Sequence, residues 1–152
     1  MRLTHDEVMT STSTRKTKVK SLQASAIALG AFRILAGLLF MTHGTAKLFG
    51  WPTGSPAALG AWPMWWAGAL EVVLGGLIAL GLFARAAAFV GSGMMAVAYF
   101  WMHWGGEPGK LFWWQNRGEV VMLFSFIWLF FAAAGAGPFS LDAWRSQRSS
   151  NS

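Results

Sequence analysis

The segment 24–48, ASAIALGAFRILAGLLFMTHGTAKL, decides the fold because it is almost continuously apolar. As a helix that rises 1.5 Å per residue it measures about 37 Å, which exceeds the roughly 30 Å hydrocarbon core of a bilayer. Three further apolar segments follow, at residues 64–82, 86–102 and 120–137. The pattern predicts an all-α fold, a bundle of four transmembrane helices.

The composition also indicates a membrane protein. Apolar residues make up 55% of the chain and charged residues only 12%, about half the usual charged share of a globular protein. The net charge of +6 lies mostly at the two ends, because residues 1–21 and 145–152 carry seven basic and two acidic side chains. Such basic ends favour a lipid surface over nucleic acid. The sequence has no Cys, which excludes disulfides, thiolate catalysis and cysteine-ligated metals.

The chain divides into three parts. Residues 1–21 are polar and basic without apolar periodicity, and we expect a disordered tail there. Residues 22–142 form the membrane domain, and residues 143–152 form a short C-terminal tail. A signal peptide would have a shorter apolar run followed by a cleavage site, so we assign the first apolar segment to the mature protein. Around Ser140 and Asp142 we expect a short capped turn at the membrane interface.

Small residues predict where the helices pack closely, because they let two backbones approach each other. The third segment repeats them every four residues, at Ala84, Ala88, Ser92 and Ala96. The second segment has Gly68, Gly75, Gly76 and Ala79.

The basic residues outside the spans predict the orientation. With four spans, one side holds Arg2, Arg15, Lys16, Lys18, Lys20, Arg85, Arg145 and Arg148, and the other holds Lys47, Lys110 and Arg117. The excess on the first side places both termini in the cytoplasm, as in a multi-pass protein of the plasma (inner) membrane. Most of the ten Trp lie in the two outer connections, where indole side chains prefer the headgroup layer.

Ionisable side chains inside apolar segments are costly unless they are paired, so each marks a candidate site. Arg33, His43 and Lys47 share an arc of about 80° on the first helix. This face of the helix must therefore point toward the other helices. Glu71 lies in the second segment, and we predict an Arg33–Glu71 ion pair with His43 within reach of the same carboxylate. An alternative is that this pair only locks the first helix to the second.

Further polar residues lie at the outer ends of the third and fourth segments. They are His103, Asn116 and Glu119. A cavity that holds such groups among Trp side chains suits a flat lipophilic molecule with hydrogen-bonding carbonyls, such as a quinone. We predict catalytic, proton-exchanging roles for His43, Glu71 and His103, and substrate-binding roles for Arg33, Lys47, Asn116 and Glu119. The identity of the cofactor stays open, and a quinone is the candidate that these residues suggest.

Other kinds of site are less well supported. Two His could bracket a haem, but His103 lies at a helix end. A metal site from His43, His103, Glu71 and Glu119 lacks the tight ligand spacing of known helical sites, so we predict no metal. Passage of a small molecule through the bundle is disfavoured because no broken helix is evident.

Several motifs resemble those of DoxX family membrane proteins. The first is Arg33 followed by Gly37-Leu38-Leu39-Phe40-Met41-Thr42-His43-Gly44 and Lys47-Leu48-Phe49-Gly50. The others are Glu71 with Gly75-Gly76, then Gly81-Leu82-Phe83-Ala84-Arg85, Met95-Ala96-Val97-Ala98 with His103, Asn116-Arg117-Gly118-Glu119, and Gly135 with Gly137-Pro138-Phe139-Ser140-Leu141-Asp142. The resemblance covers residues 30–142, and Arg117 departs from it where a glycine is expected.

The resemblance implies a four-helix inner-membrane protein of the oxidoreductase class. Relatives in that family include a subunit of an archaeal thiosulfate:quinone oxidoreductase and a mycobacterial membrane partner of a superoxide dismutase and a sulfurtransferase. We therefore expect a membrane component of a quinone-linked oxidoreductase system. The alternative is a non-enzymatic membrane anchor or assembly factor for soluble redox enzymes. The expected partners are the lipid bilayer, soluble redox enzymes and further copies of this chain, with no nucleic acid.

Overall fold

The computed structural model describes residues 5–104, 110 and 112–149, with side chains from residue 15 onward. Its elements in chain order are α1 (His5–Phe49), α2 (Met64–Leu80), α3 (Ala84–Ala98), the π-helix η1 (Tyr99–Trp104), α4 (Trp113–Asn116), α5 (Glu119–Ala134) and α6 (Leu141–Ser149). These described residues form helices and no strand, which confirms the predicted all-α class.

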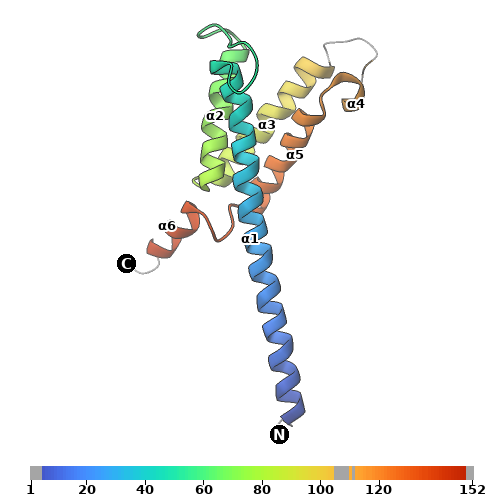
Figure 1. Cartoon of the computed structure of the whole chain (residues 1–152), viewed down its shortest axis with the longest axis vertical. Coiled ribbons are helices and arrows are strands. Elements are labelled where there is room, and N and C mark those ends of the chain that lie inside the picture. Colours follow the sequence, from blue (N-terminus) through green and yellow to red (C-terminus); the bar gives the residue numbers. More distant parts are fainter. Residues whose placement is uncertain (1–4, 105–109, 111, 150–152) are drawn as a thin grey trace.

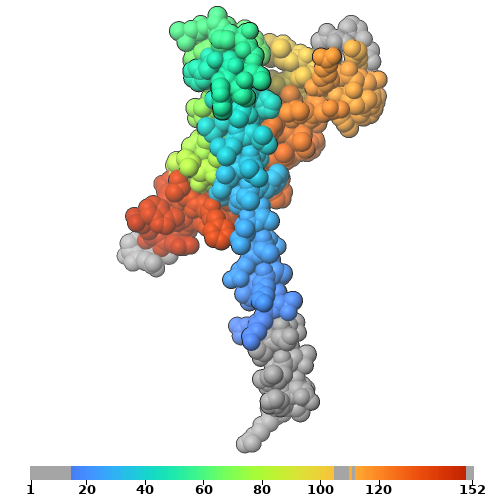
Figure 2. Space-filling model, in the orientation of Figure 1, coloured from blue at the N-terminus to red at the C-terminus, as the bar shows by residue number. Residues whose placement is uncertain are grey.

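The long helices are arranged as two pairs (Figure 1). α1 packs along α2, α3 packs along α5, and a tight turn at residues 81–83 joins α2 to α3. Figure 1 shows the two pairs meeting near this turn and diverging toward the end that carries loop 50–63 and η1. On the side of the turn, α1 extends alone beyond the other helices, as Figure 2 also shows.

The apolar helices fit a membrane environment. Arg15–Phe49 and the continuous stretch Ala84–Trp104 are long and apolar enough to cross a bilayer, while α2 and α5 are apolar but shorter. Large apolar side chains are exposed on the outer faces of all four, among them Leu35, Val73, Phe89 and Phe126. A water-soluble protein rarely exposes so many such side chains together. That all four helices cross the bilayer stays a prediction.

Two glycine contacts set the distance and the register between α1 and α2. A Cβ on Gly37 would lie 2.7 Å from the carbonyl oxygen of Gly75, and a Cβ on Gly75 would lie 2.7 Å from that of Gly37. Seven residues along each helix, a Cβ on Gly44 would lie 2.6 Å from the carbonyl oxygen of Gly68. Any side chain would push the backbones apart, so both contacts require glycine.

Small residues also join α3 to α5. Ser92 donates its hydroxyl to the carbonyl of Ser125 at 2.9 Å, and Ser125 donates to the carbonyl of Ser92 at 3.2 Å. Gly91 leaves room for the indole of Trp128, which a Cβ would approach to 3.1 Å. Ala84 and Ala88 are fully buried on the same face. The predicted small-residue face of this helix is therefore a packing surface.

Aromatic side chains hold the two pairs together where they meet. Phe40 of α1 packs against Phe124 and Trp128 of α5, with ring centroids 5.1 and 5.2 Å apart. Trp128 and Ile78 are fully buried in the same core. Burial of each such large side chain contributes about 1.5–3 kcal/mol in water, and close packing has the same role in lipid.

α1 begins at His5, within the segment 1–21 for which a disordered tail stays a prediction. Each residue added to an existing helix gains one backbone hydrogen bond, so a helix can extend beyond the part that other helices contact. The Ser21 hydroxyl donates to the Lys18 carbonyl at 2.9 Å, and the Ser25 hydroxyl donates to the Ser21 carbonyl at 3.0 Å. The side chains of residues 15–25 are exposed, so this part of the helix is stabilised by local bonds.

The expected capped turn near Ser140 is the start of helix α6. The Oγ of Ser140 accepts the Ala143 N–H at 3.2 Å, as an N-cap does. Asp142 also caps α3, because its two carboxylate oxygens accept the N–H groups of Phe83 and Ala84, each at 2.9 Å. The Asp142 N–H donates to the carbonyl of Gly81 at 2.9 Å. This segment therefore holds the α2–α3 turn, in which Gly81 and Phe83 both have positive φ.

We expect Gly75→Val to lower the free energy of unfolding by about 2–3 kcal/mol, because the added carbons meet the Gly37 backbone. The matched control is Gly76→Val, since a Cβ there has its nearest neighbour, the Met41 sulfur, at 3.9 Å. Thermal unfolding in detergent, followed by circular dichroism, measures both variants. Equal losses for the two variants would contradict the glycine contact.

Candidate functional site

A cavity of about 380 Å³ lies where the two helix pairs diverge. Its wall is mostly apolar and aromatic, with contributions from α1, α2, α3, η1 and α5. The apolar lining includes Phe40, Trp62, Met64, Trp66, Leu70, Met94, Met95, Val97, Trp101, Met102, Val121 and Phe124. Four ionisable side chains complete it: His43, Lys47, Glu71 and His103. The cavity therefore offers an apolar body and a small set of polar groups, which is typical of a small-molecule site.

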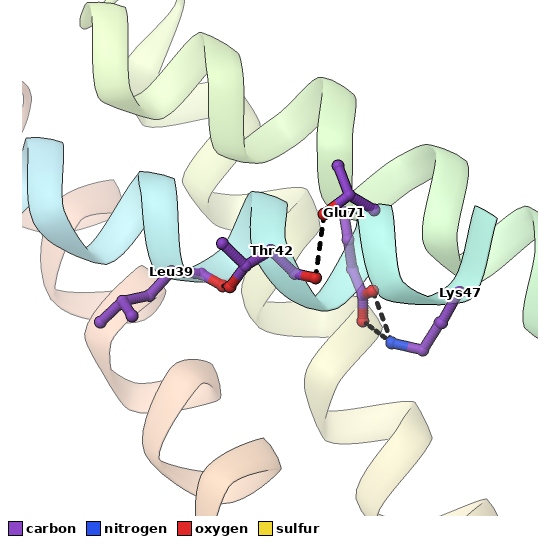
Figure 3. A network of polar contacts seen from close by, with 5 residues as sticks. Leu39, Thr42, Lys47 and Glu71 are labelled. Atoms are coloured by element: carbon purple, nitrogen blue, oxygen red, sulfur yellow. Dashed lines mark hydrogen bonds and ion pairs between the residues drawn. The ribbon is translucent and has the colours of Figure 1, made fainter. Parts of the chain in front are cut away.

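Lys47 and Glu71 form an ion pair between α1 and α2. The Nζ of Lys47 lies 2.6 Å from Oε1 and 2.5 Å from Oε2 of Glu71, as Figure 3 shows. The Glu71 side chain is 5% exposed and that of Lys47 is 23% exposed. Each residue follows a glycine of the Gly44–Gly68 contact by three positions, so that contact brings the two charges together. The ammonium compensates a carboxylate whose solitary burial would be costly.

His43 stands on the cavity side of α1. Its ring meets Phe124 of α5 edge-on, with ring centroids 5.7 Å apart and an interplanar angle of 85°. The side chain is exposed even though α1 is packed on both sides, because the cavity opens beside it. The imidazole is thus available to a molecule in the cavity.

His103 lies in the π-helix η1, at the end of α3. Its Nδ1 is 3.0 Å from the backbone carbonyl of Asn116. A carbonyl oxygen only accepts hydrogen bonds, so Nδ1 carries the hydrogen and Nε2 of the neutral ring is left as the acceptor. The ring also stacks on Tyr99, with centroids 6.4 Å apart. π-Helical turns are frequent at functional sites, and His103 lines the cavity from this one.

Asn116 does not line the cavity and instead orders the chain around His103. Its Nδ2 donates to the Tyr99 hydroxyl at 3.5 Å and to the Lys110 carbonyl at 3.4 Å, while its Oδ1 accepts the Gly118 N–H at 2.9 Å. The structure thus places Asn116 outside the cavity wall, and the substrate-binding role that we predicted for it stays a prediction.

The predicted Arg33–Glu71 ion pair is wrong. The guanidinium of Arg33 donates to the backbone carbonyls of Ala136 and Phe139, the latter at 2.7 Å, and the residue is 1% exposed. The reason is depth along the helix. Arg33 comes fourteen positions before Lys47, which places Arg33 about 21 Å from Lys47 along α1, toward the N-terminus. Arg33 therefore lies beside the α2–α3 turn, where a Cβ on Gly81 would be 3.1 Å from its Cζ. It is not part of the cavity.

Glu119 also lies outside the cavity. It is exposed in the first turn of α5, where a carboxylate interacts favourably with the helix dipole. Among the residues that the structure describes, no group of three or more His, Cys, Asp or Glu side chains could hold a metal ion.

Sequence reasoning missed the partner of Glu71 and the methionines of the cavity. The depth of Lys47, close to the outer end of the first helix, was a usable signal, because Glu71 lies about two turns below the outer end of the second. Met64, Met94, Met95 and Met102 gave no comparable signal, since methionine is common in apolar helices.

The helices and the cavity define an all-helical membrane protein with a lipophilic cavity that is charged at one end. Residues 28–104 match the DoxX family model, and the chain belongs to the DoxX family. The matched range contains all four ionisable residues of the cavity. An uncharacterized protein of Haemophilus influenzae is 41% identical over 117 residues, which cover 75% of this chain and 87% of that protein. No solved structure matches the chain.

We expect Lys47→Met to lower the free energy of unfolding by about 3 kcal/mol or more, because it leaves the buried Glu71 carboxylate without its partner. The double variant Lys47→Met, Glu71→Leu should recover most of this loss, since no charge then remains buried. A double-mutant cycle by thermal unfolding in detergent checks this expectation. A double variant as unstable as Lys47→Met would argue against the ion pair.

Arg33→Met should also lower the free energy of unfolding by about 3 kcal/mol, because it removes two charge-assisted hydrogen bonds from a buried guanidinium to backbone carbonyls. Arg85→Met is the matched control, since that guanidinium bonds the Ala133 carbonyl at 2.6 Å from an exposed position. Its loss should be below about 1 kcal/mol. The idea fails if the two variants unfold at the same temperature.

Proposed function

We propose that this protein binds a quinone in the cavity and acts as a membrane component of a quinone-linked oxidoreductase system. The observation that carries the proposal is the composition of the cavity wall. One part consists of thioether, aliphatic and indole groups, and the other of two imidazoles and an ion pair. A quinone has the same two parts, a flat apolar ring and carbonyl oxygens that accept hydrogen bonds.

The residues present fit such a molecule. Lys47 has three donors, two of which suffice for Glu71, so its ammonium can also donate to a carbonyl of the ring. His43 can donate to or accept from the ligand. The Nε2 of His103 can accept the proton of a hydroxyl, because Asn116 holds the hydrogen on Nδ1. Met94 and Met102 can adapt to rings of different shape, since their side chains are flexible and polarisable.

A bound quinone would supply the two-electron chemistry, and the residues of this chain would handle its protons and its position. The indoles of Trp66 and Trp101 and the phenyl ring of Phe124 exclude water from the apolar part. His43, Glu71 and His103 are the groups that can exchange protons with the ligand. Because the chain has no Cys, the electrons come from a bound cofactor, a partner or the substrate itself and not from a thiol of this protein.

The location is part of the proposal. Multiple spans, an inner-membrane location and cytoplasmic termini are supported by the distribution of basic residues, since the exposed Arg15, Lys16, Lys18 and Lys20 lie on the same side as Arg145 and Arg148. The cavity then opens in the outer half of the bilayer.

A titration with a short-chain benzoquinone tests the proposal, because three Trp of the cavity wall would be quenched by the bound ring. We expect saturable quenching of Trp fluorescence in detergent. His43→Ala and His103→Ala should each raise the Kd about tenfold, as the loss of one good hydrogen bond does. Glu119→Gln is the control and should leave the Kd unchanged, since Glu119 lies outside the cavity. Quenching that does not saturate would overturn the proposal.

The second candidate is a non-enzymatic anchor for soluble redox enzymes. It is favoured by the part of α1 that extends beyond the other helices with exposed basic side chains. Reversing the charges of Arg15, Lys16, Lys18 and Lys20 should then remove co-purifying enzymes while the quinone titration stays as in the unaltered protein. Co-purification that instead depends on Glu71 would favour the first candidate.

A further inference from the structure

A second cavity of about 340 Å³ adjoins Lys47 at loop 50–63. It is lined by Ala46, Lys47, Thr53, Gly54, Ser55, Ala57 and Met64. Thr53 and Ser55 are exposed, so this cavity opens to the solvent at loop 50–63. Lys47 and Met64 line both cavities. The same two side chains thus border both a solvent-open space and a lipophilic one.

The loop that forms the second cavity is fixed to α1. The Ala57 N–H donates to the carbonyl of Lys47 at 2.8 Å, and the Gly50 N–H donates to that of Ala46 at 3.0 Å. Gly50 has φ of +72°, and a Cβ there would lie 3.0 Å from the Gly54 carbonyl oxygen. The chain therefore folds back over the end of α1, and Thr53 and Ser55 line the same cavity as Lys47.

The opposite end of the first cavity is closed. Phe40, Ile78 and Trp128 are at most 1% exposed and fill the space between the helix pairs. Beyond them Arg33 binds the carbonyls of Ala136 and Phe139 and is itself buried. A layer of this kind is a poor path for protons, because its one side-chain polar group, the Trp128 indole N–H, is a donor only and has no hydrogen-bond partner.

We propose that the Lys47–Glu71 ion pair is the route by which protons move between the lipophilic cavity and the water at loop 50–63. The ligand that gives or takes these protons is that of the proposed function, while the route itself is a property of the two cavities. Glu71 faces the first cavity and Lys47 faces both, so the pair can receive a proton on one side and release one on the other.

Each transfer moves one net proton, here from the ligand to water. A hydroxyl of the ligand gives its proton to the Glu71 carboxylate, and the ligand oxygen keeps the electron pair of the O–H bond. The Glu71 acid then passes its proton to Lys47 as the ammonium releases another to water in the second cavity. Lys47 ends with three hydrogens and Glu71 ends ionised, so the pair returns to its starting state.

The test uses access of a carbodiimide, which couples an adjacent amine and carboxyl group into an amide. In proteoliposomes, a water-soluble carbodiimide should link Lys47 to Glu71, whose atoms are 2.5 Å apart, and join the α1 and α2 peptides in a digest. Ser55→Cys introduces the one thiol of the chain, and labelling it with a bulky membrane-impermeant maleimide should slow the coupling at least tenfold. Leu59→Cys, labelled in the same way, is the control, because Leu59 is 87% exposed and outside both cavities.

A lipid-soluble carbodiimide keeps the test decisive, because it reaches the pair through the apolar cavity. It should couple the labelled Ser55→Cys protein at the unlabelled rate, which shows that the variant is folded. No coupling by the water-soluble reagent, or an equal rate with and without the label on residue 55, overturns the route. Added benzoquinone should slow only the lipid-soluble reagent. If it does not, the proposed function fails while the route stands.

Discussion

The close approach of α1 and α2 at two pairs of glycines is the constraint on which the rest of the structure depends. Gly37 meets Gly75 and Gly44 meets Gly68 at distances that leave no space for a Cβ. Two contacts seven residues apart fix both the register and the crossing of the helices, because a shift of one residue would place a side chain at a backbone contact. The register in turn sets Lys47 opposite Glu71.

The same constraint explains why the molecule has a cavity. α1 and α2 are held together at the Gly37–Gly75 and Gly44–Gly68 contacts, and α3 and α5 are joined by the Ser92–Ser125 bonds and by Trp128 against Gly91. The two pairs meet through the rings of Phe40 and Phe124 but diverge beyond them. The space left there is bounded by apolar side chains, and the register of α1 and α2 places the Lys47–Glu71 ion pair on its wall.

The sequence predicted the helices well and their side-chain partners less well. Apolar length placed α1, α2, α3 and α5, and small residues correctly indicated close packing at Gly68, Gly75 and Ser92. A helical wheel gives the face of a residue but not its partner, so Arg33 was assigned to Glu71 when it binds the carbonyls after α5. The position of His103 depends on a π-helical turn and on the Asn116 carbonyl, neither of which has a pattern in the sequence. The proton-exchanging roles of His43, Glu71 and His103 stay predictions.

The caps formed by Asp142 have a consequence for the synthesis of the protein. The carboxylate that holds Phe83 and Ala84, and the N–H that holds Gly81, belong to a residue that follows all four apolar helices in the chain. The carbonyls that receive Arg33 are likewise made after α5. During translation α1, α2 and α3 are therefore made before the residues that fasten the α2–α3 turn. The contacts at that end can form only after α5 has been made.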